Sequence, residues 1–162
     1  MKIDPATLAD LDALVEGWVT LAEEQREHGS YLRAEPNRDP MRESLAKSVV
    51  SDDVLVARDD GAVIGFVTLE IERGRLEETV TRGVVPYLFV FPDRRNEGVG
   101  AELLEAAESS LLDRGADVVS LDVMAGNEAA RRFYRRHGYG SYRVRVEKSV
   151  SDESDTHSRD DR

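Results

Sequence analysis

Near the middle of this chain, an apolar segment leads into a glycine turn and an apolar repeat: Val84-Val85-Pro86-Tyr87-Leu88-Phe89-Val90-Phe91-Pro92-Asp93-Arg94-Arg95-Asn96-Glu97-Gly98-Val99-Gly100-Ala101-Glu102-Leu103-Leu104. Its first part is apolar and rich in β-branched and aromatic residues, which predicts a strand near residues 84–91. The glycine turn and the apolar repeat that follows predict a helix over about 98–113. A strand, a glycine turn and a helix in this order point backbone N–H groups and a helix dipole at one place. The stretch therefore predicts an anion site built mostly from main chain.

The turn itself suits a phosphate. Gly98 and Gly100 have no Cβ, so an anion can approach the backbone closely, and Arg95 can add a charge-assisted contact. The same glycines would also permit tight packing of strand on helix, and the turn alone does not separate the two readings. Two known phosphate loops do not fit. No Gly-Lys-Ser/Thr follows the turn, and Leu103 stands where a dinucleotide fingerprint needs a third Gly or Ala.

The remaining periodicity predicts a mixed α/β (α+β) fold in the order β-α-α-β-β-β-α-β-α-β. Thr7 and Asp10 form a capping box for the first helix, and Asp39 is the expected N-cap of the second. The other expected elements are a strand near Ile3, helices over 7–28, 39–50 and 128–137, a hairpin of 54–57 with 62–71, a strand over 118–123, and a half-buried antiparallel strand over 142–146.

The length of 162 residues and the apolar content of 40% indicate one domain, expected over residues 1–148. The acidic, polar segment 149–162 is expected to be disordered. The formal net charge is −11, and the only lysines are Lys2, Lys47 and Lys148. This balance opposes nucleic-acid binding. It also resembles the surfaces of proteins from high-salt cytoplasm, so we expect a halophilic origin, with an acidic mesophilic protein as the alternative.

Other classes of protein are disfavoured by what the sequence lacks. There is no cysteine, and the three histidines have no metal-ligand spacing, so we expect neither disulfides nor a metal site. No apolar run approaches the roughly 20 residues that a membrane helix needs. The start, Met1-Lys2-Ile3-Asp4-Pro5, does not resemble a signal peptide. We therefore expect a cytoplasmic protein that does not bind a membrane.

A second motif follows the first along the chain. The sequence Arg95-x-x-Gly98-x-Gly100-Ala101 after an apolar strand resembles the signature of the GCN5-related N-acetyltransferase (GNAT) family. The segment Asn127-x-x-Ala130-x-x-Phe133-Tyr134-x-x-x-Gly138-Tyr139 is similar to the second motif of that family, at the expected distance. The resemblance covers about residues 1–148. It implies a strongly twisted mixed sheet flanked by helices, and acetyl transfer from acetyl-CoA to a primary amine.

The resemblance also implies roles for particular residues. The strand end would splay from its neighbour and pair with the pantetheine arm, the loop would hold the pyrophosphate, and Asn127 would contact the cofactor arm near the thiol. The backbone N–H of Val90 would polarise the thioester carbonyl, and Tyr134 would protonate the departing thiolate. The implied acetyl-CoA-binding residues are Leu88, Phe89, Val90, Arg95, Asn96, Glu97, Gly98, Val99, Gly100, Ala101, Asn127 and Tyr134.

The acceptor side is less defined by the sequence. Family members often carry an acid on the strand before the loop, and this strand has none, so Glu70 is the leading candidate base, ahead of Glu72, Glu78 and Asp122. The missing acid also leaves open a non-catalytic acyl-CoA-binding or regulatory module on the same fold. An acidic surface favours a cationic acceptor, either a small amine or a protein amino group. By analogy with the family, a homodimer through the last strands is expected.

Overall fold

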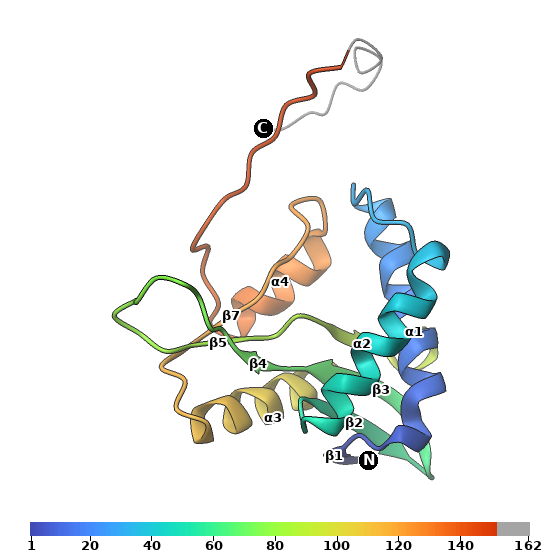
Figure 1. The fold of residues 1–162 in the computed structure, drawn as a ribbon. Coiled ribbons are helices and arrows are strands. Elements are labelled where there is room, and N and C mark those ends of the chain that lie inside the picture. The colour runs from blue at the N-terminus through green and yellow to red at the C-terminus, as the bar shows by residue number, and fades with distance from the viewer. Residues whose placement is uncertain (152–162) are drawn as a thin grey trace.

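The computed structural model describes residues 1–151 and shows helices packed on both faces of a twisted sheet (Figure 1). The predicted disorder of the tail falls mostly on residues 152–162, outside the described part. The elements, with short 3₁₀ turns before α1, α2 and α3, are β1 (Lys2–Pro5), α1 (Leu11–Glu27), α2 (Arg38–Val50), β2 (Val54–Asp59), β3 (Ala62–Thr68), β4 (Glu70–Ile71), β5 (Arg82–Val84), β6 (Leu88–Val90), α3 (Val99–Asp113), β7 (Val118–Ser120) and α4 (Glu128–Arg136).

The strands form two sheets, in the orders β1-β2-β3-β6 and β4-β5-β7. All the pairings are antiparallel except that of β5 with β7, which is parallel. The predicted strand over 84–91 is therefore two strands, broken at Pro86. Its first half pairs with β7 as far as the bond from Val85 N–H to Ser120 O (3.0 Å), and its second half pairs with β3. Beyond Val85, β7 diverges from the segment that continues into β6. The outer edge of β6 therefore has no partner strand among residues 1–151.

Each face of the sheet has its own apolar core. On one face, α1 and α2 bury Leu14, Trp18 and Leu45 against Phe66 and Phe89. On the other face, α3 packs its apolar stripe mainly against β3, β2 and β6. That second cluster contains Ile64, Val67, Val85, Leu103, Ala107 and Leu111. The two cores fix where β6 and the start of α3 lie relative to each other.

Two helix starts differ from their prediction. The carboxylate of Asp10 accepts a hydrogen bond from Thr7 N–H (2.8 Å), as the capping box requires, but the first turn is 3₁₀ and α1 begins only at Leu11. The N-cap of α2 is Asn37 instead of Asp39, because a 3₁₀ turn over Glu35–Asn37 runs directly into the helix. Asp39 consequently lies within the first helical turn, where its charge still complements the helix dipole.

The predicted last strand is wrong. Residues 140–150 form neither helix nor strand, and all of them are exposed. We call residues 140–151 the C-terminal arm; it projects from the domain beside β5 and β7 (Figure 1). The alternation of apolar and charged residues is that of a strand, but a strand also requires a neighbour with free backbone groups, and no strand of the described residues pairs with the arm.

Candidate active site

The loop before α3 presents a row of free backbone donors. No hydrogen-bond acceptor among the described residues meets the N–H groups of residues 96–101, and Gly98, the N-cap of α3, provides no side chain to cap them. The first amide of this helix that is bonded is that of Glu102, to Gly98 O (3.2 Å). Unpaired amides at a helix start, together with the helix dipole, form a binding place for an anion.

Glycine is required at one position of this loop and serves a different purpose at another. Gly98 has a φ of +85°, and a Cβ added there would meet no atom within 4 Å, so the space in front of it is open. Gly100 lies inside α3, and a Cβ there would stand 3.6 Å from Phe133 Cζ and 3.7 Å from Val90 Cγ2. The end of β6, the start of α3 and the helix α4 therefore meet around Gly100.

The free edge of β6 faces this meeting point through two of its residues. Tyr87 O accepts from Thr68 N–H and Phe91 N–H donates to Ile64 O, so the backbone of these odd-numbered residues is directed at β3. Since backbone direction alternates along a strand, Phe89 is also directed at β3, and the N–H groups of Leu88 and Val90 point to the open edge. The predicted splay of the strand end is confirmed.

The structure uses Arg95 differently from its predicted role. Its guanidinium makes a two-pronged ion pair with Glu24 of α1 (2.8 and 2.9 Å), and its Nε donates to Val90 O (2.8 Å). It also lies over the Phe89 ring. Arg95 thus ties the end of β6 to α1, and its donors are already engaged before any anion binds. The partner of this contact lies 71 residues away, so no local pattern could have indicated it.

The carboxylate of Glu97, which would repel an anion in the loop, is drawn to a neighbouring arginine. Arg94 Nε lies 3.2 Å from Glu97 Oε1, and Arg94 Nη2 lies 2.7 Å from Asp59 Oδ2 on β2. The guanidinium lowers the pKa of the Asp59 carboxyl, chiefly by its hydrogen bond. Arg94 therefore offsets the negative charge of Glu97, and the loop amides stay accessible to an anion.

The start of α4 is fixed by Asn127. Its side-chain oxygen accepts from Ala130 N–H (3.1 Å), and its own N–H donates to Met124 O (2.9 Å). The cap uses the carbonyl of the side chain, so the side-chain NH₂ carries no bond to the described residues. Gly126 places this loop against the end of α1, because a Cβ there would lie 3.3 Å from His28 O.

The phenol of Tyr134 is buried around its ring and open at its oxygen. The ring packs edge-on against Phe133 (5.2 Å) and Tyr139 (5.8 Å). Its hydroxyl has no hydrogen-bond partner among residues 1–151. In this part of the chain every fully buried polar side-chain atom does have a partner, so the Tyr134 oxygen is accessible to solvent. Burial raises the pKa of Tyr134 to about 12, which keeps the phenol protonated throughout the physiological range.

Apart from its motif position, no sequence pattern indicates a role for Tyr139. Its hydroxyl donates to Glu108 Oε2 of α3 (2.6 Å). Burial, and then this hydrogen bond, raises the pKa of Tyr139 far above its usual range. The contact joins the end of α4 to α3 and holds the ring that supports Tyr134.

The candidate bases differ in the ion pairs that they make. Arg82 lies 3.9 Å from Glu72 and 3.4 Å from Glu78, and its guanidinium therefore competes for both carboxylates. Glu70, exposed on β4 opposite Val84, makes no ion pair with a described residue, and neither does Asp122 in the loop after β7. Glu70 also lies next to Leu69, where the paired strands pass from one sheet to the other.

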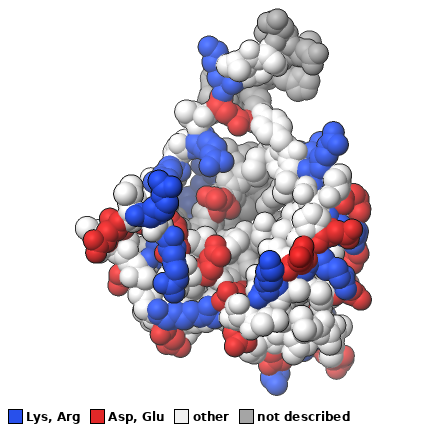
Figure 2. All heavy atoms as spheres, viewed as in Figure 1, with Lys and Arg blue, Asp and Glu red and all other residues white. Residues whose placement is uncertain are grey.

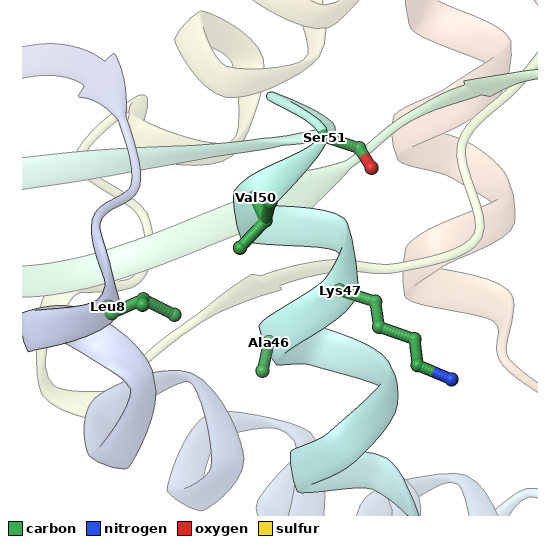
Figure 3. A pocket seen from close by; sticks show the side chains of 5 residues that line it. All are labelled: Leu8, Ala46, Lys47, Val50 and Ser51. Atoms are coloured by element: carbon green, nitrogen blue, oxygen red, sulfur yellow. The ribbon is translucent and has the colours of Figure 1, made fainter.

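The face seen in Figure 2 is hollowed between α4 and the pair α1 and α2, and both acidic and basic side chains lie around this hollow. A different hollow of about 500 Å³ lies between the start of α1 and the end of α2 and is lined by Leu8, Ala46, Lys47, Val50 and Ser51. There Lys47 points away from Leu8 (Figure 3), and no motif residue contributes to the lining.

Comparison with known proteins agrees with this arrangement. Residues 16–139 match the profile of the Acetyltransferase (GNAT) family. The chain belongs to the GNAT family. An N-acetyltransferase of Archaeoglobus fulgidus is 34% identical to this GNAT chain over 134 residues, which is 83% of this chain and 89% of that protein.

Solved structures share the fold. A mutant of a Bacillus halodurans protein superposes with a TM-score of 0.82 at 22% identity, covering 93% of this chain and 100% of that one. A PaiA N-acetyltransferase of Thermoplasma acidophilum, solved with coenzyme A, gives a TM-score of 0.71 at 22% identity over 89% and 92% of the two chains. The GNAT chain is thus an acetyl-CoA-dependent N-acetyltransferase with a mixed α/β fold. None of the helices within residues 1–151 is long and apolar enough to cross a bilayer.

Proposed function

We propose that the protein transfers the acetyl group of acetyl-CoA to a primary amine, by direct attack of the amine in a ternary complex. The observation that carries the proposal is the convergence around Gly100 of unpaired loop amides, the free edge of β6 and the motif helix α4. The domain that does this chemistry is residues 1–148, and the acceptor is either a small cationic amine or a protein amino group.

The loop before α3 is suited to bind the pyrophosphate of acetyl-CoA. The amides of residues 96–101 are free, and the open space before Gly98 lets phosphate oxygens reach them. The residues of this cradle are Asn96, Glu97, Gly98, Val99, Gly100 and Ala101. Arg132, Arg135 and Arg136 on α4 are exposed and have no acidic partner among the described residues, so they are available to further phosphates.

The free edge of β6 is suited to bind the pantetheine arm and the thioester of acetyl-CoA. The backbones of Leu88 and Val90 face the gap between the sheets, whereas Phe89 contributes the buried ring beneath them. The NH₂ group of Asn127, held in place by the cap, is a further donor to the arm. The N–H of Val90 is suited to the thioester oxygen, where one preorganised donor contributes on the order of 2.7–4 kcal/mol as negative charge develops.

The proton transfers fall to two residues. Tyr134, a phenol with a protonated and accessible oxygen, donates its proton to the thiolate that leaves the acetyl group. The amine arrives protonated in water and must first lose a proton, for which the unpaired Glu70 is the proposed base. The net charge of −11 favours a cationic amine by complementary charge.

Release of free thiol from acetyl-CoA, measured over a panel of amines, tests the proposed function. The protein contains no cysteine, so every thiol detected comes from CoA. We expect release that depends on the amine. Release that is the same with and without every amine, including peptides with free amino termini, would refute an amine acceptor. Glu70→Gln should lower turnover at neutral pH, and Glu72→Gln, on a carboxylate already near Arg82, is the matched control.

A further inference from the structure

Two neighbouring aromatic rings present polar atoms that no described residue binds. They are Trp18 on α1 and Tyr87, just before β6, whose rings meet edge-on with their centres 6.3 Å apart. Neither the indole N–H nor the phenol hydroxyl has a hydrogen-bond partner in residues 1–151, where every fully buried polar side-chain atom does have one. Both atoms therefore reach solvent, although only 2% of Trp18 is exposed. The pair offers two donors to a ligand.

The backbone that carries each ring is held in place. The N–H of Tyr87 donates to Thr68 Oγ1 (3.0 Å), and the carbonyl of Tyr87 accepts from Thr68 N–H (2.9 Å). Next to Trp18, Gly17 brings α1 directly onto the sheet, because a Cβ there would stand 2.8 Å from Phe66 Cε1. The two donors are therefore preorganised, and little side-chain entropy is lost when a ligand binds them.

The proposed base lies on the same face of the sheet as these donors. Leu69 and Ile71 both pack into the cluster under α3. Successive side chains of a strand point to opposite faces, so Glu70, between them, points to the face that α1 and α2 cover. Trp18 and Tyr87 lie in the core of that face. Glu70 is exposed, so the face is open to a substrate where β4 begins.

The chemistry of the donors selects among amine acceptors. An indole N–H only donates, so Trp18 requires an oxygen acceptor and gains nothing from a second ammonium group. Tyr87 can donate to the same oxygen. On this face, the guanidinium of Arg95 lies over the Phe89 ring and is already paired with Glu24 (2.8 Å). Because a buried carboxylate needs a charged partner, the two neutral donors suit a neutral carbonyl better.

We propose, as an extension of the proposed function, that Trp18 and Tyr87 bind a carbonyl oxygen beside the reacting amine, so that the acceptor is an α-amino amide, the group at the amino terminus of a peptide. Only two carbon atoms separate its amine nitrogen from its carbonyl oxygen, so the bound oxygen fixes the position of the amine. In the transfer, the nitrogen bonds to the acetyl carbon and the carbon–sulfur bond breaks. Of the two protons that the ammonium group loses, one passes through Glu70 to solvent. The other replaces the proton that Tyr134 gives to the sulfur.

Alaninamide and isopropylamine test this subsite, because isopropylamine has a methyl group in place of the carboxamide. With rates expressed per unprotonated amine, kcat/KM for thiol release should be at least about tenfold higher for alaninamide. Tyr87→Phe should lower this ratio about two- to twelvefold, which corresponds to one hydrogen bond. Tyr142→Phe, which alters an exposed phenol on the C-terminal arm, is the matched control and should leave the ratio unchanged.

A second measurement uses the native protein and does not depend on turnover. The chain contains a single tryptophan, so its indole N–H gives one resonance in ¹⁵N spectra. In the presence of CoA, which supplies no acetyl group, titration with alaninamide should shift this resonance saturably. Titration with isopropylamine should leave it in place.

The outcomes separate this subsite from the proposed function. Amine-dependent thiol release with equal kcat/KM for the two amines would overturn the subsite and leave the function standing, and so would binding of alaninamide without a shift of the indole resonance. A higher kcat/KM for free alanine than for alaninamide would assign the donors to a carboxylate and overturn the amide acceptor. Failure of every amine to release thiol would refute the proposed function and this inference with it.

Discussion

Replacing Gly98 by alanine should damage acetyl-CoA binding more than it damages the fold. With φ at +85°, alanine costs about 1–2 kcal/mol of backbone strain. For a chain of this size that strain lowers Tm by about 2–8 °C. The new methyl would stand in the open space through which phosphate oxygens reach the amides, since no protein atom lies within 4 Å. We expect the Kd for acetyl-CoA to rise at least about tenfold, equivalent to about 1.4 kcal/mol.

Gly100→Ala is the matched control for that change. Position 100 is helical, and its Cβ would make ordinary contacts of 3.6 and 3.7 Å with Phe133 and Val90. Alanine should therefore raise the free energy of unfolding by about 0.5–1 kcal/mol and leave the affinity nearly unchanged. Calorimetry with acetyl-CoA and thermal unfolding measure both variants. A Gly98→Ala protein that binds acetyl-CoA as tightly as Gly100→Ala would refute the assignment of the loop.

Further changes have defined outcomes. Tyr134→Phe should lower kcat about 10²–10⁴-fold with little change in acetyl-CoA affinity. The native stabilisation from its raised pKa, about 3 kcal/mol, is present below pH 10 and is lost between about pH 10 and 12, and Tyr134→Phe should remove that dependence in alkaline denaturation. Asp10→Asn should lower the free energy of unfolding by about 3 kcal/mol, because the buried pair with Arg58 loses one partner. Arg58 lowers the pKa of Asp10, so this contribution should fade in acid as Asp10 protonates. Arg95→Ala should weaken acetyl-CoA binding less than Gly98→Ala does, because Glu24 already holds the guanidinium. Molar salt should raise Tm if the surface is halophilic, and an unchanged Tm would remove that hypothesis.

Much of this fold follows from local patterns. Apolar periodicity over 98–113 and the capping box of Thr7 with Asp10 depend on neighbours within a few residues, and both elements formed close to their expected bounds. The anion-binding loop before α3 could also be predicted, because its glycines and helix-start amides are adjacent in the sequence. Features that depend only on nearby residues can therefore be predicted from the sequence.

The features that the sequence did not show depend on distant partners. The break of the central strand at Pro86 follows from how far β7 pairs with it, which is set by tertiary packing. The engagement of Arg95 by Glu24 and of Tyr139 by Glu108 joins residues 71 and 31 positions apart. The segment 142–146 has the alternation of a strand, but alternation alone does not provide a partner, and neither sheet of the described residues includes it.

Amide spectra of the ¹⁵N-labelled protein, recorded by NMR with and without acetyl-CoA, test whether the loop amides hold the pyrophosphate. The amides of residues 96–101 have no acceptor in the described structure, and they should gain one when the donor binds. We predict that the largest shifts fall on these amides, on Val90 N–H and on the side-chain NH₂ of Asn127. Saturable binding of acetyl-CoA that leaves residues 96–101 unshifted would contradict the account.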